Sequence, residues 1–117
     1  MKEIVFKTLA LKLINFAISL LNDRLQDYWD SAGEILSVEN IKTINLKRLQ
    51  HYQNLAFVFI ETKEALESNK PLNKDNYTII HNTLQGMQEE ELICVFDNDK
   101  QLEDFKTFND NRLKELL

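Results

Sequence analysis

The chain has 117 residues, of which 44% are hydrophobic and 28% charged, and its formal net charge is −5. This length predicts a single domain, residues 1–117, with a hydrophobic core that needs no metal or disulfide. Two Gly and one Pro supply too few turn signals for an all-β fold, and the single cysteine excludes an intramolecular disulfide.

The acidic excess is confined to the last third of the chain. Residues 1–84 carry ten acidic and ten basic side chains, whereas residues 85–117 carry nine acidic and four basic ones. Contacts to nucleic-acid phosphates need clustered Lys and Arg. We therefore do not expect direct binding to nucleic acid.

Lys2 to Trp29 predict one long helix with a thin polar stripe. The stripe steps by three and four residues, which is the helical period, through Thr8, Lys12, Asn15, Ser19, Asp23 and Gln26. The rest of the circumference is mostly apolar, so other helices are expected to cover it on more than one side. We expect this helix to stop near Asp30–Gly33. A second helix is expected from Ser31, which with Glu34 has capping-box spacing, or from Ser37.

The same stretch is long enough to cross a membrane, about 42 Å as a helix at ~1.5 Å per residue. However, Lys7, Lys12 and Asn15 interrupt it. A charge at bilayer depth costs roughly 2.5 kcal/mol or more, and the same lysines break the apolar region of a signal peptide. The expectation is a soluble cytoplasmic protein with no membrane contact.

Apolar positions from Val38 to Leu66 follow helical spacing and predict a long second segment. Thr43–Leu46 departs from the pattern, and Asn45 has the chemistry of a cap, so a kink or break is expected there. The run Leu55–Ile60 is wholly apolar and is expected to pack directly on the first helix.

Ser68–Asn73 is the clearest loop, because Pro71 lacks an N–H and disfavours helix just before it. A third helix is expected from Asn73 or Asp75, and Gly86 either ends it or is tolerated inside it. Its apolar face comprises Tyr77, Ile80, Leu84 and Met87.

Glu89–Phe96 contains five consecutive apolar residues and fits either a buried strand or a short buried helix. We favour a helix, because a lone strand would have nothing to pair with, and expect Cys94 to be a small buried hydrophobe. Asn98 and Gln101 then have capping-box spacing for a final helix. The predicted fold is all-α: a compact bundle of five to six helices around the N-terminal one.

No catalytic or metal-binding pattern stands out. His51 and His81 both lack the Glu three residues upstream that di-metal helical bundles use, and one Cys with two separated His is too little for zinc. We expect no metal, no cofactor and no enzymatic activity. An enzyme built around Glu61, Glu64 or His51 is the least favoured alternative.

Two acidic clusters are candidate partner-binding sites. The first is a strip at the end of the N-terminal helix, beside two aromatic residues, and comprises Asp23, Asp27, Tyr28, Asp30 and Glu34. The second lies in the last third of the chain and comprises Glu89, Glu90, Glu91, Asp97, Asp99, Glu103 and Asp104. Like charges this close repel one another, and a basic partner would relieve the repulsion and accelerate encounter. Solubilising surface charge is the competing interpretation.

The expected function is protein binding. By analogy of class, we expect a small acidic inhibitor, such as a bacterial immunity protein or antitoxin that neutralises a basic, nuclease-type toxin. Its carboxylates would occupy the place of nucleic-acid phosphates. The alternative is a self-associating helical module, in which a homodimer finishes burying the apolar first helix.

Overall fold

The computed structural model describes residues 1–35, 46–68 and 70–117, with the side chains of 25–35, 46–49 and 52–53 outside the description. Within these ranges lie α1 (Glu3–Ile35), α3 (Leu46–Glu67), α4 (Lys74–Gly86), α5 (Glu89–Leu92) and α6 (Asp99–Leu116). None of the described residues forms a strand. The predicted all-α class and the long apolar N-terminal helix are confirmed for the described chain.

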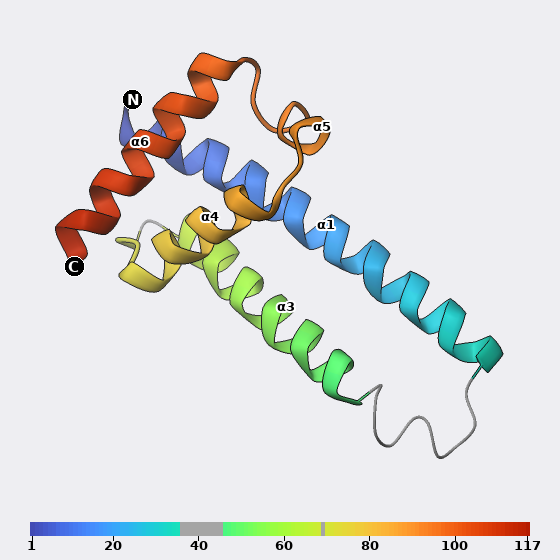
Figure 1. Ribbon diagram of the computed structural model, residues 1–117. Coiled ribbons are helices and arrows are strands. Elements are labelled where there is room, and N and C mark those ends of the chain that lie inside the picture. Colours follow the sequence, from blue (N-terminus) through green and yellow to red (C-terminus); the bar gives the residue numbers. More distant parts are fainter. Residues whose placement is uncertain (36–45, 69) are drawn as a thin grey trace.

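The helices α1 and α3 lie side by side as an antiparallel hairpin, and α4 and α6 lie across the end that holds the N-terminus (Figure 1). Three helices, α3, α4 and α6, contact α1, as its wide apolar surface predicts. The molecule measures 52 × 28 × 22 Å. Its long dimension follows the hairpin, whereas α4, α5 and α6 gather at one end (Figure 1).

The first helix is longer than expected. It continues to Ile35, so the predicted stop near Asp30–Gly33 and the new helix start at Ser31 are wrong. A capping-box spacing is a local signal that a continuing helix overrides, and one Gly inside a helix costs only about 1 kcal/mol relative to Ala. The alternative start at Ser37 lies outside the described residues.

The later boundaries agree better with the sequence. The structure describes α3 from Leu46, and the residues before it, where a kink or break near Asn45 is expected, lie outside the description, so that expectation stays a prediction. Asn73 caps α4, with its Oδ1 accepting from the Asn76 N–H at 2.9 Å, and Gly86 is the last residue of α4. Asn98 caps α6 as predicted, but the Gln101 side chain accepts from the Asp97 N–H, one residue earlier than in a capping box.

Aromatic rings form the centre of the core where α1, α4 and α6 meet. Phe6 is fully buried, and its ring centroid lies 4.8 Å from that of Phe105 and 4.4 Å from that of Phe108. Tyr77 of α4 completes the group at 6.1 Å from Phe6. Because α6 supplies two of these rings, its position on α1 is set mainly by aromatic packing.

Because Tyr77 is buried, we expect the free energy of unfolding to decrease at alkaline pH. Burial raises the pKa of its phenol above the ordinary value of 10.0, and the Arg112 guanidinium opposes the shift. Above pH ~10 the unfolded chain loses this proton first, so stability falls with rising pH until the folded phenol also ionises. We expect Tyr77→Phe to lose less stability than the native protein between about pH 9 and pH 11, measured by urea unfolding. Equal losses in both proteins would contradict this assignment.

The apolar run Leu55–Ile60 only partly meets its expectation. Phe59 is buried, but Phe57 is 63% and Ile60 49% exposed. Consecutive residues of a helix point in different directions around its axis, so six consecutive apolar residues cannot all face α1. The prediction that the whole run packs on the first helix is therefore wrong for Phe57 and Ile60.

Within the described residues, Glu3–Arg24 is long and apolar enough to cross a membrane by length and composition, with a mean hydropathy of 1.8. Of this window, 39% is buried inside the protein. The same length and hydropathy suit a helix that packs against α3, α4 and α6 at once.

Candidate functional site

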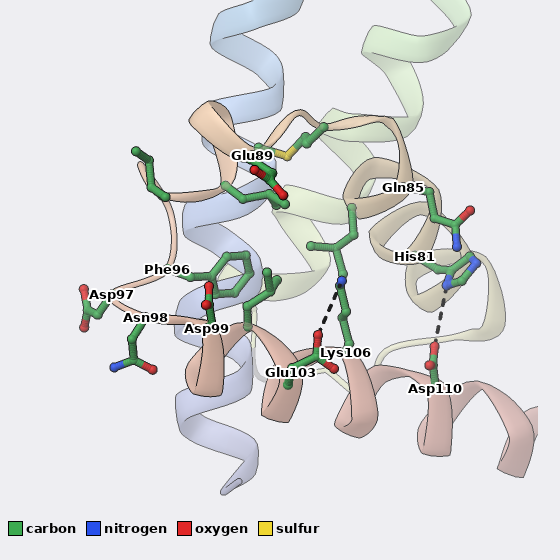
Figure 2. A pocket seen from close by; sticks show the side chains of 15 residues that line it. His81, Gln85, Glu89, Phe96, Asp97, Asn98, Asp99, Glu103, Lys106 and Asp110 are labelled. Atoms are coloured by element: carbon green, nitrogen blue, oxygen red, sulfur yellow. Dashed lines mark ion pairs between the residues drawn. The ribbon is translucent and has the colours of Figure 1, made fainter.

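A pocket of about 820 Å³ lies between α4, α5 and α6 (Figure 2). We call it the α6 groove. The residues that line it are His81, Leu84, Gln85, Met87, Glu89, Leu92, Ile93, Phe96, Asp97, Asn98, Asp99, Leu102, Glu103, Lys106 and Asp110. It collects side chains that the sequence places on three separate helices and the turn between two of them.

The helix α6 contributes the charged wall of the groove. Asp99, Glu103, Lys106 and Asp110 follow one another at intervals of four, three and four residues, so they lie on one helix face. Asn98 fixes where this face begins, because its side chain accepts from the Gln101 N–H at 2.8 Å and caps the helix. The cap sets the start of α6, and the spacing of the carboxylates places them on a common face.

The opposite wall comes from α4. His81, Leu84 and Gln85 lie on neighbouring turns of α4 and line the groove. The imidazole Nδ1 of His81 lies 3.5 Å from Asp110 Oδ1, and this pair joins the two helices at one end of the groove (Figure 2). Nearer the other end, Lys106 Nζ lies 3.8 Å from Glu103 Oε1.

The helix α5 and the turn after it contribute Glu89, Leu92 and Ile93 to the lining of the groove. This helix has a single turn, and Glu91 accepts from the Gln88 N–H at 2.9 Å to cap it. Helix was thus the correct choice over strand for the start of Glu89–Phe96. The helix ends at Leu92, however, and a turn follows.

Because of this turn, some residues of the apolar run are buried and others are exposed. Val95 and Phe96 are buried, whereas Ile93 is 76% exposed and Cys94 is exposed too. The prediction of a buried Cys94 is therefore wrong. A run of apolar residues stays on one buried face only while one element continues, and here the helix stops in the middle of the run.

The groove combines an apolar floor with an acidic rim. The floor contains the buried side chains of Leu84 and Phe96 and the partly buried ones of Met87, Leu92 and Leu102. The rim carries five carboxylates against one lysine, namely Glu89, Asp97, Asp99, Glu103 and Asp110 against Lys106. Among the described residues, Glu89, Asp97 and Asp99 have no ion-pair partner.

Four of the seven predicted residues of the second acidic cluster line the groove: Glu89, Asp97, Asp99 and Glu103. Glu90 and Glu91 lie outside it, and Asp104 faces a smaller pocket of about 360 Å³ beside Lys2 and Lys100. The cluster is thus divided, and within α6 Glu103 and Asp104 lie on different surfaces. Periodicity explains the split, since Asp104 lies about 100° around the helix from Glu103.

The first acidic strip lies far from the groove, toward the other end of the hairpin (Figure 1). Because α1 is continuous to Ile35, Asp23, Asp27, Asp30 and Glu34 do share one helix. Asp23 is exposed, while the side chains of Asp27, Tyr28, Asp30 and Glu34 lie outside the described part.

Sequence reasoning did not assign Asp110 or His81 to the site. The spacing of Asp99, Glu103 and Asp110 already places all three on one face of a helix. His81 carried no such signal, because only the packing of α4 against α6 brings it within 3.5 Å of Asp110.

The positions considered for enzyme chemistry lie elsewhere. Glu61, Glu64 and Glu67 are exposed on α3, where Lys63 Nζ lies 3.8 Å from Glu67 Oε1, and His51 is also exposed. Across the described ranges, no group of three or more His, Cys, Asp or Glu side chains is arranged to hold a metal ion. The groove carboxylates are spread along a wall and do not converge on one point.

Comparison with known proteins adds no family. No family model, curated protein or solved structure matches the chain.

Proposed function

We propose that this protein binds and inhibits a basic protein partner, and that the α6 groove is the surface that does so. The observation that carries the proposal is the groove itself, in which five carboxylates and one lysine surround an apolar floor. By analogy of class, the partner is a nuclease-type toxin and the protein is its immunity protein or antitoxin. The inhibitor would act in the cytoplasm and needs no cofactor.

Electrostatics support a basic partner. A concave surface lined mainly by one sign of charge focuses the field and raises the association rate of an oppositely charged protein by roughly 10- to 1,000-fold. Glu89, Asp97 and Asp99 have no ion-pair partner among the described residues, so their charge is available to a ligand. The potentials of neighbouring carboxylates add together when the carboxylates lie within the screening length, which is about 10 Å at 0.1 M salt.

The first test captures the partner. The tagged protein is incubated with lysate of its source organism, and bound proteins are eluted with rising salt and identified by mass spectrometry. We expect a basic protein whose nuclease activity the purified chain inhibits at equimolar ratio. If the retained protein has no nuclease activity, the proposal that the partner is a nuclease-type toxin is wrong. Failure to retain any basic protein would overturn the proposal.

The second test assigns the surface. We expect the triple variant Glu89→Gln, Asp97→Asn and Glu103→Gln to slow association with the captured protein about 10-fold or more at low salt, because the steering charge is lost. The matched control, Glu61→Gln with Glu64→Gln and Glu67→Gln, removes the same number of exposed carboxylates away from the groove. It should change the rate much less. Equal slowing by both variants in stopped-flow measurements would mean that only net charge matters.

Self-association is the second candidate function. Phe57 and Ile60 lie one turn apart on α3 with exposed fractions of 63% and 49%, and a second copy of the chain would cover them. A single monomeric species at high micromolar concentration in sedimentation equilibrium would count against this alternative.

A further inference from the structure

We propose that the α6 groove recognises a segment of the partner in which one large apolar side chain is flanked by Arg or Lys. This inference rests on the proposed function and specifies its chemistry. A purely acidic surface would select charge alone. The α6 groove adds an apolar floor, and the two kinds of surface together define a more specific occupant.

The apolar part of the argument begins with Ile93. This side chain is 76% exposed, and it lines the groove together with the buried Phe96 and the partly buried Leu102. Burying a side chain of this size contributes roughly 1.5–3 kcal/mol when burial is complete. An apolar side chain of a partner that enters here would cover Ile93 and the floor in one step.

The requirement for basic side chains follows from the length of the α6 face that carries the carboxylates. Asp99 and Asp110 lie eleven residues apart on α6, and at ~1.5 Å per residue this separates them by roughly 16 Å along the helix. Glu103 lies between them and Asp97 just beyond the end. A segment with its apolar residue at the centre can therefore place basic side chains on both sides of it against carboxylates.

The occupant is a segment of another protein, on grounds of charge complementarity. A small apolar ligand would leave the carboxylate wall without partners, and an acidic one would be repelled by it. A second copy of this chain is the remaining competitor, and its binding would appear as concentration-dependent assembly.

The test uses defined peptides and the intact protein. The probe is fluorescein-labelled Arg-Ser-Arg-Phe-Arg-Ser-Arg, compared with the same peptide carrying Ser in place of Phe and with one carrying Glu in place of Arg. Fluorescence anisotropy measures affinity, and amide chemical shifts locate the site. We expect the Phe peptide to bind about 10-fold more tightly than the Ser peptide and the Glu peptide not to bind. The shifts should fall on the residues that line the α6 groove.

The variants separate the apolar contribution from the charge. Ile93→Asn should weaken the Phe peptide about 5- to 10-fold and leave the Ser peptide unchanged. The matched control is Ile4→Asn, since Ile4 is 74% exposed on α1 and does not line the groove, and it should change neither affinity. Because both isoleucines are exposed, both variants are expected to fold.

Several results would overturn the inference. Equal affinity for the Phe and Ser peptides would show that the groove recognises only charge. The proposed contact with an apolar side chain would then be wrong, whereas the proposed binding of a basic protein would not be affected. Shifts outside the groove, or groove shifts that grow with protein concentration without peptide, would assign the surface to another role. Absence of peptide binding at millimolar concentration would also overturn the anchor, whereas the lysate capture tests the proposed function independently.

Discussion

Replacing Phe6 with alanine should lower the free energy of unfolding by about 3–5 kcal/mol, the usual cost of removing a buried phenylalanine. Phe6 is fully buried and packs against the rings of Phe105, Phe108 and Tyr77. Its loss leaves a cavity at the point where α1, α4 and α6 meet. Since a domain of this size is stable by only about 5–15 kcal/mol, the variant should be close to unfolding at 37 °C.

Phe57→Ala is the matched control for this prediction. It removes the same atoms from α3 at a position that is 63% exposed, so we expect a change of less than about 1 kcal/mol. Both variants are compared by urea unfolding followed by circular dichroism. If Phe57→Ala costs as much as Phe6→Ala, the placement of α3 in the structure is incorrect.

A variant that still folds allows a further check. Because Phe105 and Phe108 hold α6 against Phe6, the cavity should also loosen the charged wall of the groove. Amide hydrogen exchange of α6 should therefore accelerate more than that of the α3 segment around Phe57. Uniform acceleration along the chain would mean that the rings do not hold α6 specifically.

Replacing Asn109 with aspartate should lower stability at neutral pH by roughly 3 kcal/mol or more. Asn109 is only 1% exposed, and its Nδ2 donates to the Tyr77 carbonyl at 3.1 Å. A carboxylate at this place has no proton to donate and is an uncompensated buried charge. The bond links α6 to α4, so the loss falls on the helix pair that forms the groove.

The pH dependence gives this prediction its sign. In the unfolded chain the new carboxyl titrates near its ordinary pKa of about 3.9, and burial raises the pKa in the folded state. Below the ordinary value the carboxyl is protonated in both states and can again donate to the Tyr77 carbonyl. The deficit relative to the native protein should therefore be small near pH 4 and grow as pH rises to neutral.

Asn109→Leu provides the control. It removes the hydrogen bond without adding charge, so its cost should be about 1–2 kcal/mol and nearly independent of pH. Urea unfolding of the two variants and the native protein at several pH values gives the comparison. A deficit of Asn109→Asp that does not change with pH would show that the position is hydrated rather than buried.

Parts of the candidate site were visible in the sequence. The negative charge of the last third and the helical spacing of Asp99, Glu103 and Asp110 are sequence properties, because an α-helix converts spacing directly into a common face. The groove itself could not be predicted from the sequence. Its lining comes from α4, α5, the turn after α5 and α6, and only the packing of these elements brings the lining residues together.

The sequence by itself determined the helical class, the loop before α4, and the caps at Asn73 and Asn98, since these depend on neighbouring residues. Periodicity also predicted which face of α4 is apolar. Tertiary structure decided the rest. It carried α1 past Asp30–Gly33 and brought His81 to Asp110. It also left Phe57, Ile60 and Cys94 exposed. The hydrophobicity of a side chain indicates that its burial lowers the free energy of the folded state. Which side chains are buried is determined only by the packing of helices that are distant in sequence.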